Sequence, residues 1–326
     1  MTRRAESPHA PRLLRVLIAF IAALVLPVTV SAPAVSAAAV AGGEESARTW
    51  TVQVGSESSS QAIQGMAFLP GNIYINAGDK VTWEANSAEI HTVTFLAKGQ
   101  SLRSTQPFNP SLPQNIYQRG GKAYDGHSYY NSGVMTNVSD SGFKQVTKYT
   151  LAFPRKGNFT YYCLVHGMAM KGVVHVRAAG TDYPYSQAQY DRQAERQERA
   201  ILRDGRQAWE DARDQADEHT VIAGTDNGTS MVMRFVQQKV EIRVGEKVTF
   251  VNSGMGAPHT VTFGKEPANV FVPRGNPAKF AGGDLNSGIM PPHSKFTVTF
   301  TKAGEFDYIC GLHDFMGMVG TVEVRR

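Results

Sequence analysis

Near the end of this chain, residues 306–324 contain a nine-residue stretch that begins with a cysteine, contains a histidine and ends with a methionine. They are Cys310, His313 and Met318, and apolar residues alternate on both sides of them, as in a pair of β-strands joined by a loop. Thiolate sulfur, imidazole nitrogen and thioether sulfur form a ligand set for a soft or borderline metal, and copper suits it best. Such a loop needs a rigid scaffold, and this requirement constrains the fold of the surrounding chain.

The same arrangement is present earlier, within residues 159–176, where Cys163, His166 and Met170 follow one another in the same order. The sequence of 326 residues contains two cysteines, and both belong to these segments. If both thiolates bind metal, the chain has no disulfide.

One further histidine precedes each segment, because the sequence His-Thr-Val-Thr-Phe occurs at residues 91–95 and again at 259–263. Two imidazoles and a thiolate, with a weakly bound thioether, can hold both Cu(I) and Cu(II) with little rearrangement. The sequence therefore predicts two copper ions per chain, in two ligand sets: His91, Cys163, His166 and Met170; and His259, Cys310, His313 and Met318.

The choice of thioether ligand has an alternative in the second segment. Met318 lies two positions before Gly320, as Met170 lies two positions before Gly172, and we therefore favour Met318. Met316 is the alternative, because two residues separate it from His313.

The rest of the chain predicts two similar domains. Short alternating runs, broken by Gly, Pro, Asn and Asp, are typical of an antiparallel sandwich or barrel. We place the first domain at residues 49–177, with a long loop excursion from about residue 98 to 144, and the second at 229–325, where the same order of segments returns.

A charged segment, residues 181–220, separates the two domains and predicts an α-helical linker. Apolar residues fall on one face at helical spacing, and Glu195 can pair with Arg199 one turn later. We expect an interruption near Gly205. A partly disordered linker is the alternative that the composition leaves open.

Residues 1–39 resemble a secretory signal, with a basic start, an apolar run at 16–26 and small residues that offer cleavage sites. An uncleaved membrane anchor is the alternative, although the run is short for a bilayer span. We therefore expect an exported protein, extracellular, in the cell envelope or periplasmic, whose mature chain has no membrane span. Removal of this segment would lower the net charge from +5 to about +2. A charge this small gives no reason to expect nucleic-acid binding.

Both domains resemble the cupredoxin family of blue copper proteins, of which plastocyanin, pseudoazurin and amicyanin are typical. The Cys-x-x-His-x(n)-Met loop, the following Gly-x-Val-x-Val and the upstream His-Thr-Val-Thr-Phe carry this resemblance. It implies an all-β protein of two tandem Greek-key sandwiches, with a type 1 copper site at one end of each.

The resemblance also implies electron transfer with a redox protein donor and acceptor, rather than enzymatic activity. By this analogy His166 and His313 would reach the surface as electron ports. Apolar side chains around them would form the docking patches: Leu164, Val165 and Met168 in the first domain, and Leu312, Phe315 and Met316 in the second.

Two other functions share the predicted ligands. A copper oxidase or nitrite reductase would need additional histidines, often as His-x-His pairs, and the sequence contains no such pair. Copper scavenging, storage or delivery outside the membrane would use an identical ligand set and stays open.

Overall fold

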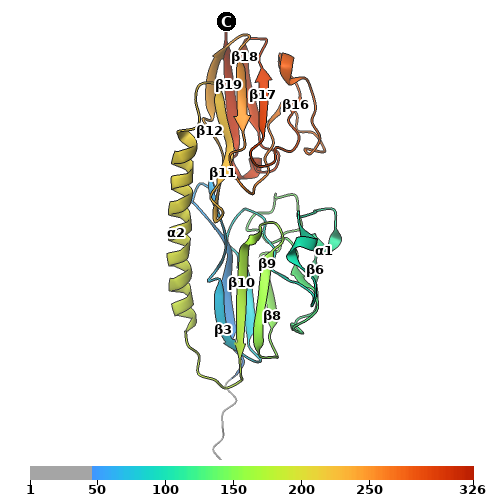
Figure 1. The fold of residues 1–326 in the computed structure, drawn as a ribbon, viewed down its shortest axis with the longest axis vertical. Helices are drawn as coiled ribbons and strands as arrows, with labels where there is room; N and C mark the ends of the chain where they lie inside the picture. Colours follow the sequence, from blue (N-terminus) through green and yellow to red (C-terminus); the bar gives the residue numbers. More distant parts are fainter. Residues whose placement is uncertain (1–45) are drawn as a thin grey trace, which may run out of the picture. The chain divides into compact units, whose positions relative to one another are not determined.

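The computed structural model describes residues 46–326, so the predicted signal segment at 1–39 lies outside the described residues. The described chain is mostly β-structure, with one long helix between two β-sandwiches (Figure 1). No helix among the described residues is long and apolar enough to cross a membrane.

The first sandwich is formed by two sheets whose strands come from residues 49–177. One layer contains β1 (Thr49–Glu57), β2 (Ile63–Leu69), β4 (Lys80–Ala85) and β8 (Lys148–Ala152). The other contains β3 (Asn72–Asn76), β10 (Gly167–Arg177), β9 (Gly157–Cys163), β5 (Thr94–Phe95), β7 (Tyr130–Ser132) and β6 (Gln118–Arg119). The predicted loop excursion adds only short elements besides β6 and β7: η1 (Leu102–Thr105) and α1 (Pro113–Ile116).

The second sandwich repeats this order. One layer contains β11 (Thr220–Asp226), β12 (Ser230–Val236), β14 (Lys247–Val251) and β17 (Lys295–Thr299). The other contains β13 (Lys239–Arg243), β19 (Val319–Arg325), β18 (Gly304–Ile309), β15 (Thr262–Phe263) and β16 (Leu285–Asn286), and the loops carry η2 (Pro277–Lys279) and η3 (Asp314–Met316). Because β11 pairs with β12 and β14, we propose that the second domain begins at Thr220 rather than at residue 229.

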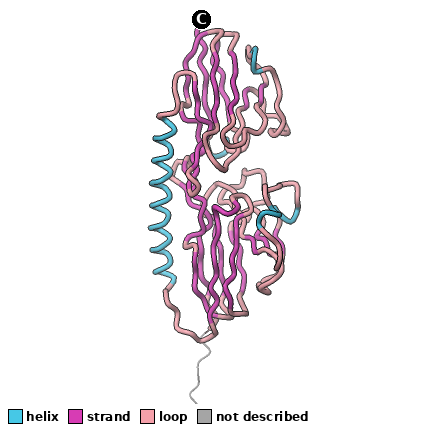
Figure 2. Tube along the Cα trace, viewed as in Figure 1, coloured by secondary structure: helices cyan, strands magenta, loops and turns pink. Residues whose placement is uncertain are grey.

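The two sandwiches share one sheet. Strand β2 pairs antiparallel with β12, and Gln64 lies opposite Met231 at the centre of this pairing. The result is one eight-stranded sheet in the order β17-β14-β11-β12-β2-β1-β4-β8, which runs through both domains (Figure 2). Each domain therefore covers an edge strand of the other, which removes two unpaired edges from solvent.

The two cores contain equivalent aromatic clusters. In the first, Trp83 lies edge-on to Tyr161, with ring centroids 5.2 Å apart. In the second, Phe250 lies edge-on to Tyr308 at 5.0 Å. All four side chains are buried, and edge-to-face packing of this kind stabilises a core beyond the area that it buries.

Helix α2 (Gln187–Arg213) lies along the shared sheet and contacts β1, β2, β11 and β12 (Figure 1). The predicted pair is present, with Arg199 Nη1 3.7 Å from Glu195 Oε2. The expected interruption near Gly205 is wrong, because the helix is continuous through this residue. A Cβ at Gly205 would lie 2.3 Å from Ile63 Cγ2, so the missing side chain lets the helix approach the sheet closely.

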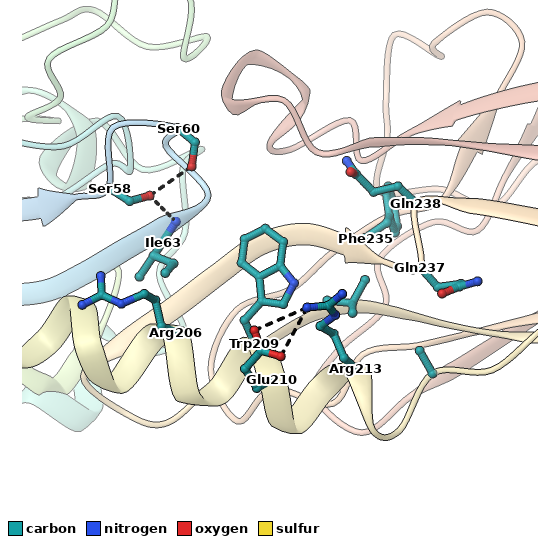
Figure 3. Close-up of a pocket in the computed structure, with 12 residues that line it drawn as sticks. Ser58, Ser60, Ile63, Arg206, Trp209, Glu210, Arg213, Phe235, Gln237 and Gln238 are labelled. Atoms are coloured by element: carbon teal, nitrogen blue, oxygen red, sulfur yellow. Dashed lines mark hydrogen bonds and ion pairs between the residues drawn. The ribbon is translucent and has the colours of Figure 1, made fainter.

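A cavity of about 690 Å³ lies beside the C-terminal half of α2. Arg206, Trp209 and Arg213 of the helix line it together with Ser58 and Gln238 (Figure 3). None of the predicted metal ligands borders this cavity, so it does not form part of the candidate metal centres.

The close contact at Gly205 yields a stability prediction. Alanine is the better helix former by about 1 kcal/mol, yet we expect Gly205→Ala to destabilise the protein by about 1 kcal/mol or more, because its methyl group meets Ile63. The urea midpoint of unfolding measures this effect. Arg203→Ala, on the exposed face of the same helix, serves as the control and should change stability by less than about 0.5 kcal/mol. A Gly205→Ala protein more stable than the wild type would contradict this account of the helix contact.

Candidate metal centres

In the first domain, the structure brings together two imidazoles and a thiol from distant parts of the chain. Cys163 ends β9, His166 lies in the turn between β9 and β10, and His91 lies opposite Met135 in an isolated β-bridge. The Nδ1 atoms of the two histidines lie 3.2 Å apart. Cys163 Sγ lies 3.4 Å from Nδ1 of His166 and 3.8 Å from Nδ1 of His91.

The second domain repeats this geometry with the same distances. The Nδ1 atoms of His259 and His313 lie 3.2 Å apart, and Cys310 Sγ lies 3.4 Å from His313 Nδ1 and 3.8 Å from His259 Nδ1. Among the residues described, these two groups of three are the clusters of His, Cys, Asp and Glu whose ligand atoms lie close enough together to hold a metal ion. Three soft or borderline donor atoms that converge in this way fit copper.

Burial keeps all of these groups neutral without metal. It raises the pKa of each thiol, Cys163 and Cys310, to about 11. Burial also lowers the pKa of His166 to about 3 and that of His313 to about 4, and a nearby imidazole adds to the effect at His166. Neutral imidazoles are ready to bind metal, whereas the thiol must first lose its proton.

A threonine beside the upstream histidine organises each site. In the first domain, Thr92 N lies 3.4 Å from Cys163 Sγ and donates to it, while Leu164 N donates to Thr92 Oγ1 at 2.8 Å. In the second domain, Thr260 N lies 3.3 Å from Cys310 Sγ. The backbone N–H stabilises a thiolate, and the hydroxyl holds the residue that follows the cysteine.

The two predicted thioethers are both fully buried, each in the core of its own domain. Met170 belongs to the same buried cluster as Cys163, and Met318 to the same cluster as Cys310. Cys310 N also donates to Met318 O at 3.0 Å. The alternative, Met316, packs with the core of the first domain instead, which supports Met318 as the proposed ligand.

A glycine at a β-bulge makes room for each upstream histidine. Gly55 and Gly224 have φ values of +76° and +75°, and the strand register shifts at both positions. A Cβ would lie 2.5 Å from His91 Nε2 at Gly55 and 2.1 Å from His259 Nε2 at Gly224. Sequence analysis missed both residues, although their matching positions in the two repeats could have indicated them.

The two predicted surface ports expose only a small part of their side chains within the described structure. The side chain of His166 is 7% exposed and that of His313 is 9% exposed. Two members of the predicted docking patches, Leu164 and Met316, are buried as well, whereas Met168 is 63% exposed. Each histidine lies near the carboxyl group of Glu89, and His313 also lines a cavity.

A second cavity, of about 590 Å³, borders this position. Glu89 and His313 form part of its lining, together with Phe108, Phe143 and Phe271 from three loops. The cavity therefore lies beside His313 of the second candidate metal centre and beside Val165, which precedes His166 of the first.

Comparisons with known proteins match both halves of the described chain to one family of copper-binding proteins. The family model "copper binding proteins, plastocyanin/azurin family" matches residues 54–177 and 220–325. Plastocyanin from Mercurialis perennis is 33% identical over 104 residues, which cover 32% of this chain and 97% of that protein. The chloroplastic plastocyanin of Chlamydomonas reinhardtii is 35% identical over 108 residues, or 32% of this chain and 66% of the relative. A crystal structure of amicyanin from Paracoccus versutus is 31% identical, covers 34% of this chain and 83% of that chain, and has a TM-score of 0.24.

The bulge glycine of the second domain yields a prediction about metal binding. Gly224→Ala would place a methyl group against His259 in a backbone conformation that costs about 1–2 kcal/mol for a residue with a side chain. We expect the second site to lose its metal while the first keeps it, as measured by copper bound per chain. Gly245→Ala is the matched control, because its φ is +94° and open space surrounds it. Full copper binding by Gly224→Ala would contradict this role of the glycine.

The buried imidazoles predict acid sensitivity in the metal-free protein. His166 and His313 have folded pKa values of about 3 and 4, below the usual 6.5, so the unfolded chain binds these protons more readily. Stability should fall as the pH drops from about 6.5 toward 4. Glu89, whose pKa burial raises to about 8, acts in the opposite direction, since its contribution is lost as the pH rises from 4.5 through 8. The histidines outnumber it, so the urea midpoint should be lower at pH 5 than at pH 7, and an equal or higher midpoint would contradict the prediction.

Proposed function

Because this chain belongs to the plastocyanin/azurin family of copper-binding proteins, we propose that it is an exported electron-transfer protein with one type 1 copper site in each domain. The observation that carries this proposal is the repeated convergence of two imidazole nitrogens and one thiol sulfur at the same distances in both domains. A single cluster of this kind could be a coincidence of core packing, but two equivalent clusters at equivalent positions indicate a selected site.

In this proposal, His91, Cys163 and His166 hold the copper of the first domain, and Met170 is its weak fourth ligand. The second domain uses the equivalent set, His259, Cys310, His313 and Met318. Copper in such a set can alternate between Cu(I) and Cu(II), which supplies one-electron chemistry. Each thiol gives up its proton when metal binds, because the thiolate is the form that ligates.

The surroundings of each site favour electron transfer over a flexible copper carrier. Cys163, Met170 and the ring of His91 are almost completely buried, and two β-sheets and a bulge position them. Ligands that are fixed before metal binds keep their positions when the charge of the metal changes. A storage or delivery protein would use the same ligands, but its metal would not have to change charge while it stays bound.

We propose that redox proteins are the electron donor and acceptor, as sequence analysis suggested. The side chains of His166 and His313 expose little surface, so docking would use the side chains around them, which include members of the predicted patches. Exposed side chains near the first site, such as Met168, offer one contact surface, and the cavity lined by Phe271 and Phe143 offers another.

Single-site variants test the assignment of ligands. Cys163→Ser should remove the copper of the first domain and leave that of the second, because the two clusters share no ligand. Cys310→Ser is the matched variant and should do the reverse. Copper content measures the stoichiometry, and the visible and EPR spectra report the thiolate–copper bond of the remaining site.

The outcome separates the two candidate functions. Two coppers per chain, an intense thiolate charge-transfer band and a narrow copper hyperfine pattern in the wild type would support the proposal. A colourless protein that binds copper tightly would support storage or delivery instead, and loss of both sites in Cys163→Ser would contradict the two-site arrangement.

A further inference from the structure

One buried carboxylate, that of Glu89, lies between the outer edges of the two candidate metal centres. Its Oε1 lies 3.7 Å from Nε2 of His166 in the first domain, and its Oε2 lies 3.9 Å from Nε2 of His313 in the second. The side chain of Glu89 is only 7% exposed. The two centres therefore meet at a single acidic residue contributed by the first domain.

The nitrogen atoms that face Glu89 are those not directed at a cysteine. In both His166 and His313, Nδ1 points toward the thiol, so Nε2 is the outer nitrogen of the ring. A neutral imidazole that ligates through Nδ1 carries its hydrogen on Nε2, and an acceptor in the protein ordinarily receives this hydrogen. The upstream His91 has the Ser87 hydroxyl 2.9 Å from its Nε2, whereas His166 and His313 have the two oxygens of Glu89.

The backbone around Glu89 is fixed by side chains of the shared sheet. Glu89 N donates to Gln64 Oε1 at 3.3 Å, and Ala88 N donates to Glu57 Oε2 at 2.9 Å. Gln64 is the residue of β2 at the centre of the pairing with β12. The same strand pairing that joins the two domains thus positions the carboxylate between them.

The fold of a single domain does not require an acid at this position. Two positions before the upstream histidine, the first domain has Glu89 and the second has Ala257. Both residues are buried, and a buried carboxyl group is costly unless polar partners compensate for its lost hydration. The acid is therefore explained by what it contacts, namely the imidazoles of both domains.

We propose that Glu89 joins the two metal centres into one redox unit, in which its carboxylate accepts the Nε2–H of both His166 and His313 and the chain His166–Glu89–His313 is the path for electron exchange between the domains. This inference rests on the proposed function. The exchange oxidises one site and reduces the other by one electron, and it requires no outside oxidant or reductant. Glu89 acts as a positioning residue, because it contacts the ligands rather than the metal.

Glu89 must come closer to both imidazoles before it can form hydrogen bonds with them. At 3.7 and 3.9 Å the contacts are longer than a hydrogen bond, so each must shorten by about 1 Å or be bridged by a water molecule. The adjacent cavity leaves the carboxylate room to move toward either ring.

Nuclear magnetic resonance of the full chain loaded with Cu(I) tests the bridge itself. With ¹⁵N-labelled histidine, we expect the Nε2–H protons of His166 and His313 to be protected from exchange and shifted downfield. Glu89→Gln should release one of them, because an amide has one acceptor oxygen, and Glu89→Ala should release both. Glu266→Gln is the matched control, since Glu266 lines the same cavity and should leave both signals unchanged.

Electron exchange provides the second readout. After rapid partial reduction of the Cu(II)-loaded protein, the two sites should equilibrate by a first-order process that does not depend on protein concentration. We expect Glu89→Ala to slow this process by about tenfold or more, because the connection between the two imidazoles is lost, and to change the reduction potential of both sites, because the acceptor of both Nε2 hydrogens is removed. Glu266→Gln should leave the rate and both potentials as in the wild type.

These measurements distinguish failure of the inference from failure of the proposed function. A wild-type protein without two thiolate–copper sites would overturn the proposed function. A Glu89→Ala protein that keeps both copper sites and shows wild-type Nε2–H signals, potentials and exchange rate would overturn the bridge alone. If Glu89→Ala bound no copper, the NMR comparison of Glu89→Gln with Glu266→Gln would still decide the matter, since equal signals would refute the bridge.

Discussion

The antiparallel pairing of β2 with β12 is the interaction on which the arrangement of the two sites depends. Its backbone hydrogen bonds make one sheet out of two domains. Helix α2 packs across this pairing, and its Gly205 lies close to Ile63 of β2. Together with α2, which contacts strands of both sandwiches, this pairing sets the relative orientation of the domains that contain His166 and His313. With it, their outer nitrogens lie on either side of one carboxylate.

Burial determines the chemistry that the sites can perform. The same exclusion of water that keeps the thiols protonated and the imidazoles neutral in the metal-free chain also strengthens each interaction with a bound ion. Metal binding must supply the free energy of deprotonating the cysteine. The thiolate that forms is stabilised by a backbone N–H that already points at the sulfur, from Thr92 in the first domain and from Thr260 in the second.

Sequence reasoning selected the three residues that converge in each cluster because they are few, chemically distinctive and repeated. His91, Cys163 and His166 could be selected by residue type and spacing alone. The role of Gly55 depends on a positive φ at a bulge, and that of Glu89 depends on how the domains face each other, so neither is visible in a local pattern. For the same reason the prediction of surface histidines did not anticipate how little of His166 and His313 is exposed, since it considered each domain alone.

The pairing of β2 with β12 also explains why two repeats in one chain can place a single acid between their sites, which two identical chains could not. Equivalent strands that pair antiparallel, with Gln64 opposite its counterpart Met231, create the arrangement of a two-fold symmetric dimer. In a true homodimer, any residue near the axis occurs twice, so an acid at this position would face a second buried acid and be repelled by it. Fusion breaks the symmetry: one repeat has Glu89, the other has Ala257, and a single acidic side chain lies near the histidines of both halves.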